Sequence, residues 1–596
     1  GHCEGRARAA TAMHLYRNSK PAFAGPDPRE PTPADTAALL ATQALCAEAT
    51  GHAVLAAKGT DESAKNGSLR EAAMSLLAAA AVAEEGIGSS PNHAELRLGL
   101  SSVYALLGAA TAARDVFAPI DIKNIQMDSM IHHILPIAEG GAAPQVTFRV
   151  TQFADNLRNE VRRDIPEGCV KAYENGVYTK ALEYVDFHER LRASHSSAAA
   201  TVAKVRATLR EMSCGGGADV GAVPAGVPGS VMGALDSAAT ACQSLIATWQ
   251  TARYNEDLAT NPAWAPPTHG SNALAVPDWW RARDGSDLNP GCAVPVAGVH
   301  DAGTGAGASV AHRAGWRAAL RRRCAEVHAL HRAAAVSSTP NAPGLNALAT
   351  LRTIETLTEP SDVNALADVA KVLAPVTADA DAVSDAMLDA TASLIRRVAG
   401  ETPDPDDVSV AKLEAFADSF AQLCTRAASG LRRGEDDAVD RAANGAVPFA
   451  FYAVADAGVG VVVATQSWAG AVAGTSGKTS GNTSEASGKI AGNPALVTAV
   501  KLAAGTIADA IATVVDAATH SCAASSEVDD ARKVFAAMDE WCGPAPGGDG
   551  ARVLSSRYAA EAAKRVVSSQ RSTLGMVRDH GERLVSQLRV IADRRD

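Results

Sequence analysis

The stretch closest to a chemical motif is GTSGKTS, residues 474–480. A phosphate-binding loop needs a glycine five positions before the glycine that precedes its lysine, because the backbone must approach the phosphate closely there. Val472 occupies that place ahead of Lys478, and the Gly, Asn, Thr and Ser that follow are poor residues for starting a helix. We therefore interpret the stretch as part of a linker, not as a nucleotide site.

Hydrolytic and metal chemistry lack a complete motif as well. His188 and Glu189 begin a zinc-protease pattern, but its second histidine must follow the first at i+4, and Arg192 holds that place. No Gly-x-Ser-x-Gly sequence occurs, and the ten cysteines never come closer together than twenty positions. Such thiols are typical of a reduced, cytoplasmic protein. We expect no catalytic residue, no metal and no cofactor in this chain.

The charge of the chain argues against DNA as a partner. Its 66 Asp and Glu outnumber 55 Lys and Arg, for a net charge of -11. One stripe reverses this sign: Arg313, Arg317 and Arg321 are spaced at i, i+4 and i+8 on one face of an expected helix. It is either a solvated face neutralised by nearby acids or a contact for a polyanion such as ribosomal RNA. The last 46 residues are also basic, with ten Lys or Arg against five Asp or Glu.

The composition predicts an all-α fold. Hydrophobic residues make up 47% of the chain, but aromatics only 4%, which suits helices that pack closely through small side chains. Apolar residues recur with the helical period, whereas no convincing period-two run appears. At 596 residues the chain is too long for one ordinary core, so several domains or a repeat architecture are expected.

The clearest helical unit lies between residues 92 and 117. Leu96, Leu100, Val103 and Leu107 fall on one helical face, and the turn residues Pro91 and Asn92 predict that the helix begins there. The same window has the spacing of a tetratricopeptide hairpin, in which a large residue, an aromatic, a turn glycine, a small residue and a second aromatic interlock two helices. These residues are Leu100, Tyr104, Gly108, Ala113 and Phe117.

This unit is degenerate, and a looser copy follows it. Arg97, Ser101 and Ile125 occupy the places of the repeat's Trp, first Gly and closing Pro. A second series of the same kind is formed by Tyr173, Gly176, Ala181 and Tyr184. Because each unit needs neighbours to bury its faces, we predict a tetratricopeptide-like helical-repeat superhelix, or α-solenoid, with low-complexity insertions.

Five regions are expected along the chain. Tetratricopeptide-like hairpins fill residues 1–260, and an irregular Pro- and Gly-rich insertion follows at 261–310. Helical patterns that continue the superhelix run over 311–473. A Gly-, Ser- and Thr-rich linker at 474–493 then leads to C-terminal helices at 494–596.

No segment is expected to cross a membrane. The best candidate runs from Val447 to Thr465, but it carries Asp456 near its middle and two glycines, so a buried helix is favoured. The N-terminus has no initiator Met and no apolar signal region. It is therefore not a signal peptide, and the chain is compatible with an N-terminally incomplete fragment.

The polar segment after the first hairpin resembles a known family. The order of Asp121, Ile122, Lys123, Asn124, Ile125, Gln126 and Asp128 is similar to a segment of the auxiliary, non-catalytic subunit of the N-terminal acetyltransferase B complex, NatB. Phe187, Glu189, Arg190 and Leu191 resemble that family's downstream Phe-x-Glu-Arg-Leu sequence, and the stretch around Trp264 is a third, weaker likeness. The resemblance covers roughly residues 90 to 270.

The resemblance implies a helical superhelix that wraps a separate catalytic subunit of the GNAT fold and helps to place it at the ribosome. That complex acetylates chains beginning Met-Asp, Met-Glu, Met-Asn or Met-Gln, with acetyl-CoA held by the partner. This chain would then be an auxiliary subunit in the cytoplasm and not itself an enzyme. In agreement, its nearest likeness to an acetyl-CoA loop, Arg397 to Gly400, has Thr402 where a small residue is needed.

Two alternatives remain beside this interpretation. A generic helical-repeat adaptor of another cytosolic assembly would share the hairpins but not the segment from Asp121 to Asp128. An independent enzyme is disfavoured by the missing motifs. The segment itself is expected to be structural first, with its side chains bonding to freed helix ends, and direct partner contact is the second interpretation.

Overall fold

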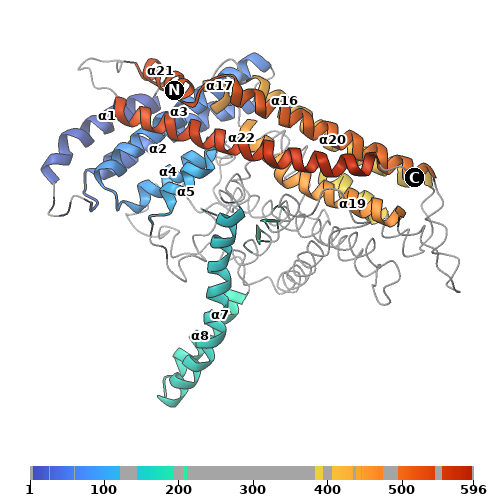
Figure 1. The fold of residues 1–596 in the computed structure, drawn as a ribbon. Helices are drawn as coiled ribbons and strands as arrows, with labels where there is room; N and C mark the ends of the chain where they lie inside the picture. Colours follow the sequence, from blue (N-terminus) through green and yellow to red (C-terminus); the bar gives the residue numbers. More distant parts are fainter. Residues whose placement is uncertain are drawn as a thin grey trace.

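The computed structural model describes the chain in several ranges, which Figure 1 shows as coloured ribbon. They are residues 4–23, 29–58, 61–120, 144–192, 383–393, 406–433, 438–443, 446–473, 494–543 and 553–593, with a few single residues between 24 and 210. Within these ranges the regular elements are helices, and no strand occurs. The predicted all-α fold is confirmed.

The N-terminal part is a row of helices in which each packs on the next, as helical repeats do. In order they are α1 (Glu4–Ser19), the short 3-10 helix η1 (Lys20–Phe23), α2 (Asp35–Lys58), α3 (Glu62–Ser89), α4 (Ala94–Leu106) and α5 (Ala110–Phe117). Helix α4 begins a little later than predicted, because the His93 ring accepts a hydrogen bond from the Leu96 amide (3.3 Å) and so caps the helix at Ala94.

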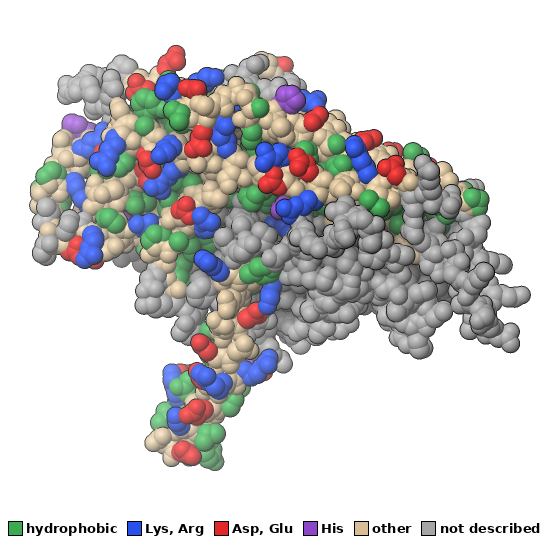
Figure 2. Space-filling view, viewed as in Figure 1, with side chains coloured by type: hydrophobic (Ala, Val, Ile, Leu, Met, Phe, Trp, Pro, Cys, Tyr) green, Lys and Arg blue, Asp and Glu red, His purple; other side chains and the backbone are tan. Residues whose placement is uncertain are grey.

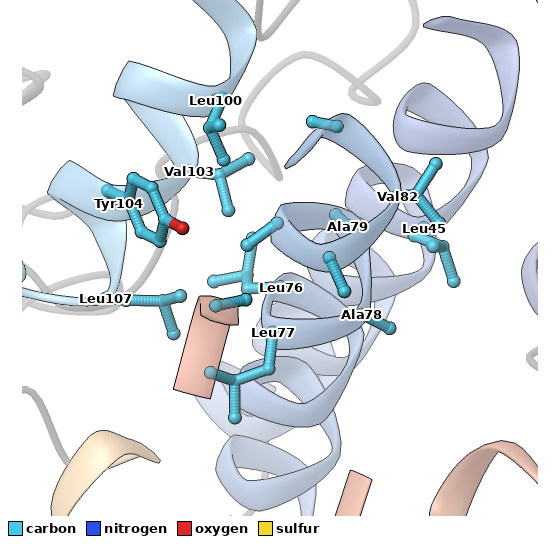
Figure 3. Close-up of a cluster of buried hydrophobic side chains, with 14 of the residues drawn as sticks. Leu45, Leu76, Leu77, Ala78, Ala79, Val82, Leu100, Val103, Tyr104 and Leu107 are labelled. Carbon is cyan, nitrogen blue, oxygen red and sulfur yellow. The ribbon is translucent and has the colours of Figure 1, made fainter. Parts of the chain in front are cut away.

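Helix α3 lies at the centre of this row. Between Ala72 and Ala83 nearly every side chain is buried, as expected of a helix that is apolar on all sides. Leu76 and Leu77 face α4, while Val82 and Leu45 of α2 lie on another side of the helix (Figure 3). We call the cluster that α1 to α5 form around α3 the N-terminal core.

A second hairpin, α7 (Pro144–Glu174) and α8 (Tyr178–Arg192), projects away from this body (Figure 1). Among the described elements, the main packing of each of these helices is with the other. The hairpin turns at Gly176, whose φ of 71° lies in the left-handed region that glycine adopts without strain.

The C-terminal part builds a second cluster, which we call the C-terminal core. It contains buried side chains of α16 (Asp406–Arg433), α18 (Ala446–Phe451), the π-helical turn η4 (Tyr452–Ala457), α19 (Gly458–Ala473) and α20 (Pro494–Ala523). Two shorter helices, α17 (Ala438–Ala443) and α21 (Glu527–Cys542), pack beside α3. The linker expected at 474–493 and the insertion expected at 261–310 lie outside the described residues.

Helix α22 (Ser556–Ala592) joins the two cores. Its first half buries Ala559, Val566 and Val567 in the N-terminal core, and its second half buries Leu574 to Ile591 in the C-terminal core. Figure 1 shows the helix running across the whole body beside α20. The far end of the chain therefore packs directly on the first hairpins.

Two described helical spans are long and apolar enough to cross a membrane by length and composition. The most apolar window of Ala446–Gly470 is 82% buried within the protein, and that of Pro494–Ala523 is 44% buried. The first span contains the segment from Val447 to Thr465 for which a buried helix was favoured. Its burial is that of a core helix.

Candidate functional site

The α4–α5 hairpin holds all five residues of the predicted repeat. Leu100, Tyr104 and Ala113 are fully buried, and Phe117 is nearly so. Gly108 turns the chain between the helices with a φ of 68°, and a side chain there would strike the ring of Pro448. Figure 3 shows Leu100, Val103, Tyr104 and Leu107 directed toward α3. The pattern thus lies at the contact of α4 with α5 and α3.

Polar side chains replace the packing residues of a consensus repeat at two places. Arg97 donates from Nε to the Pro91 carbonyl (2.6 Å) and from Nη1 to the Val116 carbonyl (3.2 Å). Ser101 donates from Oγ to the Ala113 carbonyl (2.9 Å). The bonds from Arg97 and Ser101 to carbonyls of α5 hold α5 against α4. In the consensus repeat, a large Trp and a close-packing Gly hold the two helices together by packing instead.

A buried charged network ties this hairpin to its neighbours. The Tyr104 hydroxyl donates to Glu84 Oε1 (2.7 Å), and Arg565 Nη1 lies 3.2 Å from the same oxygen. Burial raises the pKa of Glu84, although the hydrogen bond from Tyr104 and the charge of Arg565 lower it in part. Burial also raises the pKa of Tyr104 well above its ordinary value. The network links α3, α4 and α22.

Helix α22 also bonds to the turn of the hairpin. Thr111 donates to Ser569 Oγ from its backbone amide (3.0 Å) and its hydroxyl (2.6 Å), and Gln570 Nε2 donates to the Leu107 carbonyl (2.8 Å). These bonds satisfy backbone groups that helix ends leave free. Sequence reasoning missed this contact, because the bonded residues are more than 450 positions apart.

The α7–α8 hairpin carries the looser copy of the pattern. Near its base Leu157 and Val161 are buried, with Ile165 and Phe187 packed on them. Tyr184 lies close to Gly168, where a Cβ would be 3.2 Å from its ring. Toward the turn the apolar side chains are exposed, and Tyr173 is 68% accessible. Of the matched family residues Phe187 is half-buried and Glu189 exposed, while the side chains of Arg190 and Leu191 are outside the described set.

The basic charge of the last helix is largely paired. Arg571 lies 2.8 Å from Asp530, which also holds Arg441 at 2.7 Å. Arg565 pairs with Glu84, Arg578 with Asp579 (2.9 Å), and Arg589 approaches Asp509 at 3.9 Å. The basic C-terminus noted in the sequence therefore meets acids within the chain.

Three segments singled out in the sequence lie wholly or mostly outside the described residues. From Asp121 to Asp128 only Ile122 is described, and its side chain is buried in the N-terminal core. Arg313, Arg317 and Arg321 are not described at all, nor is the GTSGKTS stretch. Both proposals for these segments, structural connection and polyanion contact, stay predictions.

The described residues include no metal-binding cluster, and their buried cysteines have raised pKa values. No group of three or more His, Cys, Asp or Glu residues there could hold a metal ion. Burial raises the pKa of the Cys46 and Cys424 thiols, and that of Cys542 to about 12. These cysteines are protonated packing residues.

Both hairpins lie in the part of the chain that matches a known protein family. Residues 4–250 match the family described as the non catalytic subunit of the N-acetyltransferase B complex, NatB. The resemblance drawn from the sequence is thereby confirmed. The match includes the α4–α5 and α7–α8 hairpins and ends well before the C-terminal core.

Two curated proteins align with part of the chain. The human N-alpha-acetyltransferase 25, NatB auxiliary subunit, is 30% identical over 111 residues, which are 19% of this chain and 11% of the human protein. The NatB complex subunit arm1 of Schizosaccharomyces pombe is 30% identical over 124 residues, which are 21% of this chain and 15% of arm1. The aligned part is thus a small fraction of each relative.

Among solved structures, the NatB acetyltransferase complex bound to CoA and MES aligns over 94% of this chain and 54% of its own, with a TM-score of 0.41 and 9% identity.

Proposed function

We propose that the chain is a non-catalytic scaffold of a NatB N-terminal acetyltransferase complex. The observation that carries the proposal is the family match over residues 4–250, which includes both tetratricopeptide-like hairpins. Buried polar groups such as Glu84 and Tyr104 bond to one another and hold neighbouring helices of this scaffold together. The chemistry would belong to a separate GNAT-fold subunit that holds acetyl-CoA.

The finer proposal concerns substrate and place. The assembled complex would acetylate chains beginning Met-Asp, Met-Glu, Met-Asn or Met-Gln as they leave the ribosome, in the cytoplasm. The motif from Asp121 to Asp128 supports this assignment, because a general helical adaptor has no need of it. Contact with ribosomal RNA would fall to Arg313, Arg317 and Arg321, since several arginines of α22 already meet acids.

Co-expression with a NatB catalytic subunit tests the proposal. We expect the two chains to co-purify at a 1:1 ratio, and we expect the complex but not this chain alone to acetylate a Met-Asp peptide. A chain that does not bind the catalytic subunit, or that acetylates the peptide by itself, contradicts the proposal. A generic adaptor would instead purify with other partners.

Ribosome contact has a separate test. Reversal of Arg313, Arg317 and Arg321 to Glu should weaken co-sedimentation with ribosomes, and the binding of the wild type should fall steeply as salt is added. Acetylation of free peptides by the complex should persist. If neither the charge reversal nor added salt weakens ribosome binding, the three arginines are a solvated helix face and not a contact for RNA.

A further inference from the structure

The turn end of the α7–α8 hairpin exposes an unusual concentration of apolar side chains. The described residues include thirteen large hydrophobic residues that are exposed, and six of them lie between positions 170 and 185. They are Val170, Tyr173, Val177, Tyr178, Leu182 and Val185, which we call the tip patch. Figure 2 shows hydrophobic side chains (green) mixed with charged ones (blue and red) at the lower end of the projecting hairpin. Patches of this kind mark interaction sites.

The tip patch is a continuous surface. Tyr178, Leu182 and Val185 follow one another at i, i+4 and i+7, so they form one stripe along α8. The rings of Tyr173 and Tyr178 meet edge to face, with centroids 5.3 Å apart, and so connect that stripe to α7. Leu182 is 70% accessible, although its neighbours Ala181 and Tyr184 turn toward α7.

The charges around the patch favour an apolar protein surface as its occupant. Lys171 pairs with Glu167 and Lys180 with Glu183, both at 2.6 Å. The whole hairpin carries equal numbers of basic and acidic residues between positions 144 and 192. A polyanion would find no net positive charge there, whereas a partner with an apolar face could bury the six side chains without separating these ion pairs.

The few described residues that directly follow α8 lie away from the patch. Ala200 and Ala203 are buried in the N-terminal core, and Lys204 pairs with Asp155 in the first half of α7 (2.8 Å). The Arg210 guanidinium lies 5.5 Å from the ring centre of Phe451 in the C-terminal core. The next described residues thus lie at the base of the hairpin and in the body, away from its turn.

We propose that the tip patch is the docking surface for the catalytic subunit, an inference that rests on the proposed function. The hairpin lies within residues 4–250, the part that matches the NatB non-catalytic subunit. Because α7 and α8 pack mainly on each other among the described helices, they can present Tyr173 and Leu182 to a partner without disturbing either core. The occupant would be an apolar face of the GNAT-fold subunit, with aromatic and leucine side chains as anchors.

The test compares two double variants of the full chain. Tyr173→Gln with Leu182→Gln should weaken binding of the NatB catalytic subunit by about tenfold or more, because both anchors lose their apolar contact. The matched control, Leu502→Gln with Val528→Gln, changes two equally exposed apolar residues on α20 and α21 and should leave the affinity unchanged. In the wild-type complex, hydrogen exchange of residues 165–187 should slow.

Each other outcome overturns the inference. If the patch variant binds as tightly as the wild type, the catalytic subunit docks elsewhere and the proposed function still stands. A patch variant that melts at a lower temperature without partner would show that another segment of the chain covers the patch. A wild-type dimer that the variant dissociates would assign the patch to a second copy. If the wild type itself does not bind the catalytic subunit, both proposals fail.

Discussion

The α4–α5 and α7–α8 hairpins share one sequence pattern and differ in their surroundings. Both turn at a glycine with positive φ, 68° at Gly108 and 71° at Gly176. Tyr104 is fully buried at the first turn, whereas Tyr173 of the second hairpin is 68% exposed. Local sequence therefore specifies the hairpin, and the neighbouring helices decide what becomes core.

The neighbours of the first hairpin come from both ends of the chain. Helix α3 precedes it, and α22 bonds to its turn through Ser569 and Gln570. Among the described elements, the two helices of the second hairpin pack mainly on each other. Substitutions at matched positions should therefore separate the energetics of the hairpin from those of its surroundings.

The largest difference is expected at the two tyrosines. Tyr104→Ala should lower the free energy of unfolding by about 3 to 5 kcal/mol, because it opens a cavity and leaves buried Glu84 without its hydrogen-bond donor. Tyr173→Ala should change it by no more than about 0.5 kcal/mol, since the ring is exposed. Urea unfolding measures both values, and equal losses would mean that α7–α8 is buried in the folded protein.

The two turn glycines should differ less. Gly176→Ala has open space around it, so it should cost only the strain of a left-handed alanine, about 1 to 2 kcal/mol. Gly108→Ala adds a collision with Pro448 and should cost about 2 to 4 kcal/mol. Thermal unfolding and local hydrogen exchange would measure these costs. A Gly108→Ala protein as stable as the wild type would place Pro448 elsewhere.

A smaller contrast is expected at the alanines that follow the turns. Ala113→Leu should overpack the fully buried contact between α4 and α5 and cost about 1 to 3 kcal/mol. Ala181→Leu lies at a half-buried edge where the longer side chain can turn outward, so its cost should stay below about 1 kcal/mol. The check is the shift in the denaturant midpoint, and an unshifted midpoint for Ala113→Leu would count against the hairpin.

Short-range periodicity was enough to predict the hairpins. Leu96, Leu100 and Val103 repeat at helical spacing, and Gly108 marks a turn that few other residues could make. One residue of the proposed docking surface, Tyr173, was also in the pattern, because it belongs to the second series. What the pattern could not tell was that this tyrosine is exposed, since burial depends on elements elsewhere in the chain.

The role of α22 could not be predicted from the sequence either, because it depends on contacts with residues far away in the chain. Its sequence is basic, yet Arg565 meets Glu84, an acid 481 positions away. Nothing in local spacing reports such a pair. The buried face of this helix, including Val566 and Leu574, joins the two cores.

The smallest expected effect is a pH dependence at Glu84 of α3, to which the first hairpin bonds through Tyr104. Because burial raises the pKa of Glu84 above its ordinary value of 4.5, the folded protein keeps a proton there that the unfolded chain has already lost. This contribution to stability is complete below about pH 4.5 and declines as the pH rises through the folded pKa. Glu84→Gln removes the titration, so the stability of the wild type relative to this variant should fall as the pH rises above about 4.5.

Tyr104→Phe gives the prediction its sharper form. The Tyr104 hydroxyl donates to the Glu84 carboxylate at 2.7 Å and so lowers the pKa that burial raises. Its loss should raise the pKa of Glu84 further and make the decline of stability with pH steeper than in the wild type, whereas Glu84→Gln makes it shallower. Urea unfolding at several pH values compares the three slopes. Parallel slopes in all three proteins would mean that folding leaves the pKa of Glu84 unchanged with or without the hydroxyl, and the buried network would then hold α3, α4 and α22 together without any dependence on pH.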